Sequence, residues 1–295
     1  MRLISYRPPG GGAALGVASG DRWVAATELL PGGPATLGAL IQGGQDVLDE
    51  LRVAADAGRV ASEGRPLAEA ELLPPIDRPG KVVAIGRNYR EHVNEEGVEP
   101  PAAPLIFAKW PSAIVGPGAE IRWDPGLTGQ VDYEAELAVV IGRTARRVPA
   151  GEALGYVLGY TCLNDVSARD LQFGDGQWVR GKSLDTFCPM GPMLVTADEI
   201  PDPQDLDIEC RIGDRVVQQA NTSLMCFGVA ALVSYCSQAF TLDPGDVIAT
   251  GTPGGVGIFR TPPVLLADGD EVSVEIERIG CLSNVCRLES IGAPA

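Results

Sequence analysis

The chain has 295 residues, of which 45% are hydrophobic and 21% charged, and this balance excludes an intrinsically disordered protein. Its 39 acidic residues outnumber its 23 Lys and Arg residues, and the formal charge of −16 argues against a nucleic-acid partner. No apolar run approaches the roughly 20 residues that cross a bilayer, so we expect no membrane partner. The N-terminus does not resemble a signal peptide, and the seven cysteines lack CxxC spacing, which predicts a cytoplasmic protein with reduced thiols.

The first part of the chain is rich in Gly, Ala and Pro and predicts a small N-terminal α+β domain. Its expected elements are two short strands and one helix with apolar spacing, at 2–6, 23–26 and 37–55. The consecutive prolines Pro74 and Pro75 favour an extended connector after these elements. We therefore predict a domain boundary there, with a small domain at 1–75 and a larger one at 76–295.

The larger domain is dense with short β-type runs that are punctuated by Gly, Pro and Asp. In chain order these runs are KVVAIG, PLIFAK, ELAVVIG, YVLGYTCL, GPMLVT, DVIATG and EVSVEIERIG. They are separated by too little helix for a regular βαβ series. One clear helix is expected at 223–239, capped by Asn221 or Thr222. The pattern predicts a mixed α+β fold that is mainly β.

Three acidic residues lie within or at the end of strand-like runs. Glu134 and Glu136 are two apart in a strand-like run, so their carboxylates should share one face. Asp165 ends a second run, at the turn into a loop. Each has an ordinary alternative, a solvated strand face for the glutamates and an Asx turn for the aspartate. Together they form an all-oxygen donor set, which suits Mg²⁺ or Mn²⁺, and also Ca²⁺, better than Zn²⁺.

The one histidine of the chain, His92, precedes Glu95 by three positions in a polar segment that ends at Gly97. Residues three apart share a helix face, so the carboxylate can orient and polarise the imidazole. Such a pair can act as a general base that takes a proton from water. The alternative is an inert surface histidine beside acids.

These segments, taken in order, resemble the fumarylacetoacetate hydrolase family. The matching text is GRNYREHVNEE, PLIFAKWPSAIVGPG, DYEAELAVVIG, NDVSARDLQ, KSLDTFCPMGP and DVIATGTPGGVG, over roughly residues 80 to 280. The resemblance implies a mixed β-sandwich roll as the catalytic domain, and an assembly that is a homodimer. The first 75 residues look like the small extra domain of many members.

The resemblance also implies roles for individual residues. It implies a divalent cation held by Glu134, Glu136 and Asp165, and a catalytic pair at His92 and Glu95 on a segment that tends to act as a lid. Lys182 matches a lysine that contacts substrate. The remaining positions that look substrate-facing are Arg87, Arg169, Gln172 and Thr252.

The chemistry shared by such enzymes is formation of an enolate next to a 2-keto acid, so the expected partner is a small keto-acid substrate. With water activated by His92 and Glu95, attack on the distal carbonyl would break a carbon–carbon bond. We therefore expect a hydrolase of 1,3-diketo acids of the acylpyruvate or fumarylpyruvate type. The alternative is a metal-dependent decarboxylase or isomerase of related diacids, such as oxaloacetate or 2-hydroxyhepta-2,4-diene-1,7-dioate.

Overall fold

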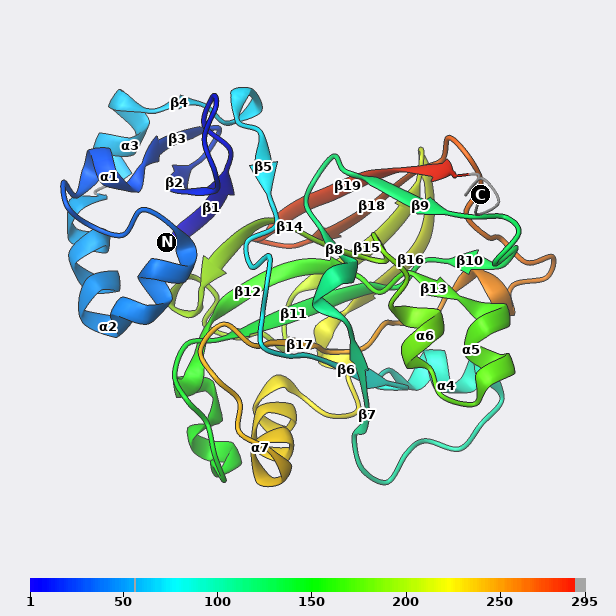
Figure 1. Cartoon of the computed structure of the whole chain (residues 1–295). Coiled ribbons are helices and arrows are strands. Elements are labelled where there is room, and N and C mark those ends of the chain that lie inside the picture. The colour runs from blue at the N-terminus through cyan, green and yellow to red at the C-terminus, as the bar shows by residue number, and fades with distance from the viewer. Residues whose placement is uncertain (56, 290–295) are drawn as a thin grey trace, which may run out of the picture.

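The computed structural model describes residues 1–55 and 57–289, and a large mixed sheet runs through its centre (Figure 1). In spatial order its strands are β4 (Arg65–Pro66), β3 (Arg22–Ala25), β2 (Ala14–Ser19), β1 (Arg2–Tyr6), β14 (Cys188–Thr196), β12 (Val157–Asn164), β11 (Ala135–Ile141), β17 (Val247–Ala249), β6 (Val82–Gly86) and β7 (Leu105–Lys109). Two short strands pair at its side, β5 (Leu72–Leu73) with β1 and β8 (Ile114–Val115) with β14. The β-type runs expected from the sequence are confirmed as strands.

A second sheet packs on one face of the first, where β15, β18 and β19 contact β11, β12 and β14. Its strands in order are β16 (Arg215–Asn221), β15 (Asp207–Ile212), β18 (Glu271–Ile276), β19 (Gly280–Leu288) and β9 (Glu120–Trp123). A small ribbon of β10 (Val131–Asp132) and β13 (Ser167–Ala168) lies beside these sheets. The result is a mainly β, mixed sandwich roll, as the sequence predicted.

Strand β11 shows why its sequence is apolar on both faces. Leu137 and Val139 lie in the hydrophobic core between the two sheets. Ala138 and Val140, which point to the opposite face, lie in a second core that the N-terminal helices cover. Since successive side chains alternate, Glu136 begins the face that carries Ala138 and Val140.

The N-terminal segment adds three helices and extends the large sheet. The helices are α1 (Ala26–Leu29), α2 (Leu37–Ala54) and α3 (Ala57–Glu63). Strand β1 pairs antiparallel with β14, with Leu3 opposite Leu194, so the sheet continues without interruption across the predicted boundary. The division into 1–75 and 76–295 stays a prediction, and residues 290–295 of the larger part lie outside the described residues.

Two predicted helices differ from the observed ones in informative ways. Helix α2 matches the expected helix but is interrupted at Gly44, whose φ of 72° and ψ of −160° are not helical. Helix α7 (Val229–Ala239) begins six residues later than predicted, after the 3₁₀ turn Thr222–Leu224. The intervening residues are not helical, and the N–H groups of Cys226 and Phe227 donate instead to Asn88, at 2.7 and 2.9 Å.

Three short helices, α4 (Arg90–Glu96), α5 (Arg169–Asp175) and α6 (Val179–Lys182), cluster near β6 and β7 (Figure 1). The remaining 3₁₀ turns span Leu67–Glu69, Pro111–Ala113, Ala150–Tyr156, Ala197–Glu199 and Gly257–Phe259. Helix α4 ends at Gly97, whose φ of 72° is left-handed, as the sequence predicted. None of the helices in the described ranges is long and apolar enough to cross a membrane.

Candidate active site

The residues predicted to form a site come together beside α4, α5 and α6. A pocket there is lined by Arg87, His92, Glu134, Arg169, Gln172, Lys182 and Thr252. The other three predicted residues adjoin it, because Glu95 bonds to His92, and Glu136 and Asp165 lie against Glu134. The free space is about 20 Å³, little more than one water, so a lining segment must move to admit a ligand.

Three buried carboxylates form the base of this site. Glu134 precedes β11, Glu136 lies in β11 and Asp165 follows β12, and one carboxylate oxygen of each lies within 4.8 Å of the others. The two glutamate carboxylates therefore converge as expected, although Glu134 lies just before β11 and not within a strand as the sequence suggested. Burial raises the pKa of Glu136 well above its usual value, and the charges of Asp165 and Glu134 raise it further.

The donor set fits a divalent cation. Among the described residues Glu136 has no ion-pair partner, and its recorded hydrogen bond comes from the N–H of Gly251, at 2.8 Å. A buried carboxylate without a cation is costly, and hard oxygen ligands are those that Mg²⁺, Mn²⁺ and Ca²⁺ prefer. Glu134, Glu136 and Asp165 would hold the cation. The N–H that bonds Glu136 comes from a position that requires glycine. Gly251 has a φ of 98°, which favours glycine, and a side chain there would collide with Asn88.

Two buried lysines neutralise part of this acidic cluster. Lys182 Nζ lies 2.7 Å from Glu134 Oε2 and 2.9 Å from Asp165 Oδ2. Lys109 Nζ donates to Asp165 Oδ1 at 2.5 Å and also to the backbone oxygen of Lys182. Burial alone would lower the pKa of Lys182, but Asp165 and Glu134 outweigh it and raise that pKa. The carboxylates around Lys182 therefore favour its charged form.

Arg169 presents one unused donor to the pocket. Its Nε donates to Asp132 Oδ2 at 2.9 Å, and its Nη1 lies 2.7 Å from Glu134 Oε1 and 2.9 Å from Gln172 Oε1. The backbone N–H groups of Gly257 and Ile258 hold Asp132 in turn, at 2.8 and 3.0 Å, and so fix the orientation of the guanidinium.

The Nη2 atom of Arg169 is buried and has no hydrogen-bond partner in the described part of the chain. Its side chain is only 2% exposed. A buried, unpaired guanidinium donor is costly in a folded protein unless a ligand completes it. This donor is therefore free to bond an acceptor oxygen that enters the pocket.

The histidine pair is held by the glycine-rich loop after β17. His92 Nδ1 lies 2.8 Å from Glu95 Oε1, and Glu95 Oε2 accepts a 2.7 Å hydrogen bond from the N–H of Gly255. With Glu95 as a carboxylate, Nδ1 carries the proton and Nε2 is the basic nitrogen. His92 is 7% exposed and lines the pocket. The alternative of an inert histidine on the surface is therefore wrong, because this histidine is buried.

The sequence reasoning missed several residues that hold the site together. Lys109 binds Asp165, Asp132 binds Arg169, and Gln218 Nε2 donates to Thr252 Oγ1 at 2.8 Å. Only Lys109 had a usable signal, because it is one of three lysines in the chain. Asp132 and Gln218 look like ordinary polar residues of short strands, and their partners are distant in sequence.

The residues 81–287 match the model of the fumarylacetoacetate hydrolase C-terminal family. The chain belongs to the fumarylacetoacetate hydrolase family. It is 43% identical over 289 residues to the mitochondrial oxaloacetate tautomerase FAHD2A of Bos taurus, covering 96% of this chain and 91% of that protein. The family assignment and the mainly β fold expected from the sequence are thereby confirmed.

Two solved structures of the family show how widely its activities range. A fumarylacetoacetate hydrolase from Exiguobacterium antarcticum superposes with a TM-score of 0.85 at 38% identity, covering 98% of this chain and all of that one. A 2-hydroxyhepta-2,4-diene-1,7-dioate isomerase from Mycobacterium marinum gives 0.74 at 39% identity, covering 98% and 99%. The chain is thus a family enzyme whose relatives act by hydrolysis, isomerisation or tautomerisation.

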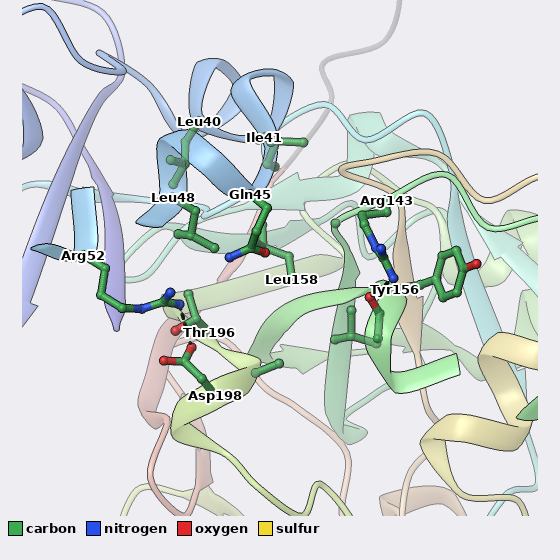
Figure 2. Close-up of a pocket in the computed structure, with 15 residues that line it drawn as sticks. Leu40, Ile41, Gln45, Leu48, Arg52, Arg143, Tyr156, Leu158, Thr196 and Asp198 are labelled. Atoms are coloured by element: carbon green, nitrogen blue, oxygen red, sulfur yellow. Dashed lines mark hydrogen bonds and ion pairs between the residues drawn. The ribbon is translucent and has the colours of Figure 1, made fainter. Parts of the chain in front are cut away.

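A second and larger cavity lies away from this family site. It has a volume of about 400 Å³ and opens between α2 and the segments around Arg143, Tyr156 and Thr196 (Figure 2). Arg52 Nη2 donates to Asp198 Oδ1 at 3.1 Å at one end. At the other end Arg143 donates to the backbone oxygen of Gly155 at 2.7 Å. We name it the α2 cavity.

Proposed function

We propose that this enzyme interconverts the enol and keto forms of a short 2-keto dicarboxylate, of which oxaloacetate is the simplest, in a reaction that depends on a divalent cation. The observation that carries this proposal is the juxtaposition of a buried three-carboxylate cluster, a carboxylate-bound imidazole and an unused guanidinium donor in one pocket. The similarity to an oxaloacetate tautomerase supports it.

The residues of the chain divide the work of this reaction. The cation would serve as a Lewis acid that stabilises negative charge on the keto oxygen. Arg169 Nη2 would bind a substrate carboxylate, with Lys182 adding a second positive charge. Gln172 and Thr252, which line the same pocket, would orient the substrate.

The proton transfer falls to the histidine pair. His92 Nε2 would remove the proton from the enol oxygen and deliver a proton to the adjacent carbon, so that the enzyme ends the cycle unchanged. Glu95, fixed by the N–H of Gly255, would hold the imidazole in the tautomer that keeps Nε2 basic. Closure of α4 over the substrate would exclude water during this transfer.

Carbon–carbon hydrolysis of a 1,3-diketo acid, the reaction we expected from the sequence, stays as the second candidate. The intact His92–Glu95 pair favours it, because the same base could activate water. The two reactions differ in whether water reaches the distal carbonyl.

Product analysis separates these reactions. With Mg²⁺ or Mn²⁺ present, we expect the purified enzyme to speed the decay of the ultraviolet absorbance of enol oxaloacetate without forming pyruvate. Acylpyruvates and fumarylpyruvate should be cleaved far more slowly. Rapid formation of two acids from an acylpyruvate would make the hydrolase correct, and rapid release of carbon dioxide from oxaloacetate would make the decarboxylase correct.

Two further expectations accompany this proposal. A homodimer is expected, and sedimentation of the purified protein tests it. A cytoplasmic location is expected from the sequence, whereas the tautomerase of Bos taurus is named as mitochondrial, so fractionation of the source cells is the measurement that decides.

A further inference from the structure

The more exposed end of the pocket carries an ion pair that the proposed chemistry does not use. Arg87 directly follows β6, and Glu96 is the last residue of α4. Their side chains meet through two contacts, Nε to Oε2 at 2.8 Å and Nη2 to Oε1 at 2.5 Å. Such two-pronged arginine–carboxylate pairs are among the strongest that side chains form. Arg87 therefore already has an anionic partner before any substrate arrives.

The pair is separated from the acidic cluster by aromatic side chains. The Arg87 guanidinium lies 5.6 Å from the centre of the Trp178 ring, which meets Phe107 edge-on at 5.3 Å. On the other side of this contact, the ammonium group of Lys182 lies 5.3 Å from the centre of the Phe107 ring. Arg87 and Glu96 are 28% and 15% exposed, whereas Lys182 and Arg169 are each 2% exposed.

The two ends of the pocket consequently offer different partners to a substrate. At the inner end the charges of Arg169 and Lys182 are also paired with carboxylates, but Nη2 of Arg169 is unpaired among the described residues. Together with the cation of the proposed function, that donor can receive carboxylate groups there. The outer end has a neutralised arginine beside a carboxylate. A second substrate carboxylate that reached this end would face Glu96 and would have to displace it from Arg87.

We infer that Glu96 determines specificity by holding Arg87, so that the site rejects 2-keto diacids of six or seven carbons and accepts four-carbon ones. A four-carbon diacid keeps both carboxylates near the inner end, and an uncharged tail of greater length meets the aromatic side chains of Phe107 and Trp178. This inference deepens the proposed function and rests on it in taking a 2-keto acid as the ligand.

Binding measurements with matched ligands test the inference. We would measure affinities by calorimetry, with Mg²⁺, for 2-oxoadipate and 2-oxopimelate and for the monoacids of equal length, 2-oxohexanoate and 2-oxoheptanoate. The wild-type enzyme should bind each diacid more weakly than its monoacid. In Glu96→Gln the diacids should bind about tenfold more tightly, and the monoacids should change by less than about twofold.

Two variants serve as controls for this result. Glu91→Gln removes a charge from the exposed face of the same helix, where no ion pair is recorded in the described chain, and should leave the ratio of diacid to monoacid affinity unchanged. The double variant Arg87→Gln with Glu96→Gln should lose the gain, because the freed guanidinium is its source.

The inference is overturned if the wild-type enzyme prefers diacids and Arg87→Gln removes that preference, since Arg87 would then be a carboxylate receptor. It is also overturned if Glu96→Gln behaves as Glu91→Gln does. None of these measurements needs turnover. The enzyme could fail to tautomerise oxaloacetate while Glu96→Gln still shifts the ratio of diacid to monoacid affinity. That result would refute the proposed reaction and uphold the role of Glu96.

Discussion

The family site and the α2 cavity both contain arginine and carboxylate side chains, but they differ in burial. Glu134, Asp165 and Lys182 are at most 5% exposed, and each contacts charged partners. In the α2 cavity Arg52 and Asp198 are 37% and 50% exposed, and Arg143 rests on the Tyr156 ring at the surface (Figure 2). The cavity with more free volume is therefore the one whose charged side chains are more exposed.

The comparison teaches that the environment of a charge, and not its presence, marks the functional place. Exposed ion pairs contribute about 0–1 kcal/mol because water screens them. A charge inside the protein must be paired or bound to a ligand, so its retention needs a reason such as catalysis. Each prediction below changes one region and measures whether this contrast holds.

The largest expected effect is on the carboxylate cluster. Glu136→Gln should abolish activity, because it removes a cation ligand, and should leave the circular dichroism spectrum unchanged. Chelation with EDTA should inactivate the wild-type enzyme and lower its Tm, since a bound ion stabilises the folded state by mass action. The variant should show no such shift, and activity retained in Glu136→Gln would remove the cluster from the mechanism.

Lys109→Met should be nearly as damaging, although Lys109 does not line the pocket. It leaves Asp165 with one lysine in place of two, and loss of one partner from a buried pair costs about 3–5 kcal/mol. We expect a lower free energy of unfolding in urea and, because the cluster loses a neutralising charge, tighter Mg²⁺ binding by calorimetry. Recovery of both wild-type values in Lys109→Arg would show that charge alone is required, and unchanged Mg²⁺ binding in Lys109→Met would contradict the role.

His92→Ala should reduce turnover by about 10²- to 10⁴-fold, the usual contribution of a general base. Mg²⁺ binding should persist, because His92 is not among the clustered carboxylates. Glu95→Gln should lower turnover less, since the imidazole remains. Near wild-type turnover in both variants would exclude the histidine pair from proton transfer.

The smallest effect on activity is expected at the α2 cavity. Gly44→Ala places a side chain at a φ of 72° and a ψ of −160°, where strain costs on the order of 1–3 kcal/mol. Its Tm should fall while kcat and KM stay the same. Arg143→Ala should change neither stability nor kinetics measurably, and a kinetic effect of either variant would mean that the cavity communicates with the family site.

Local patterns in the sequence accounted for most of the secondary structure, for the three clustered acids and for the His92–Glu95 pair, whereas the substrate-facing positions came from the family resemblance alone. Alternation and Gly, Pro and Asp punctuation indicated the strands, and Gly97 marked the end of α4. The acids at strand ends and the His92–Glu95 spacing follow from neighbours along the chain, which short-range periodicity describes. The ranking of hydrolysis over tautomerisation did not follow from them, because both reactions use the same groups.

The tertiary structure decided what holds and limits these groups. Lys109 and Asp165 are 56 positions apart, and Glu95 and Gly255 are 160 apart, so no local pattern could pair them. Arg87 looked like a free substrate contact until the fold placed Glu96 against it. Sequence determines which charges the chain carries and on which elements. Only long-range packing decides which of these charged side chains are buried and which partner each one contacts.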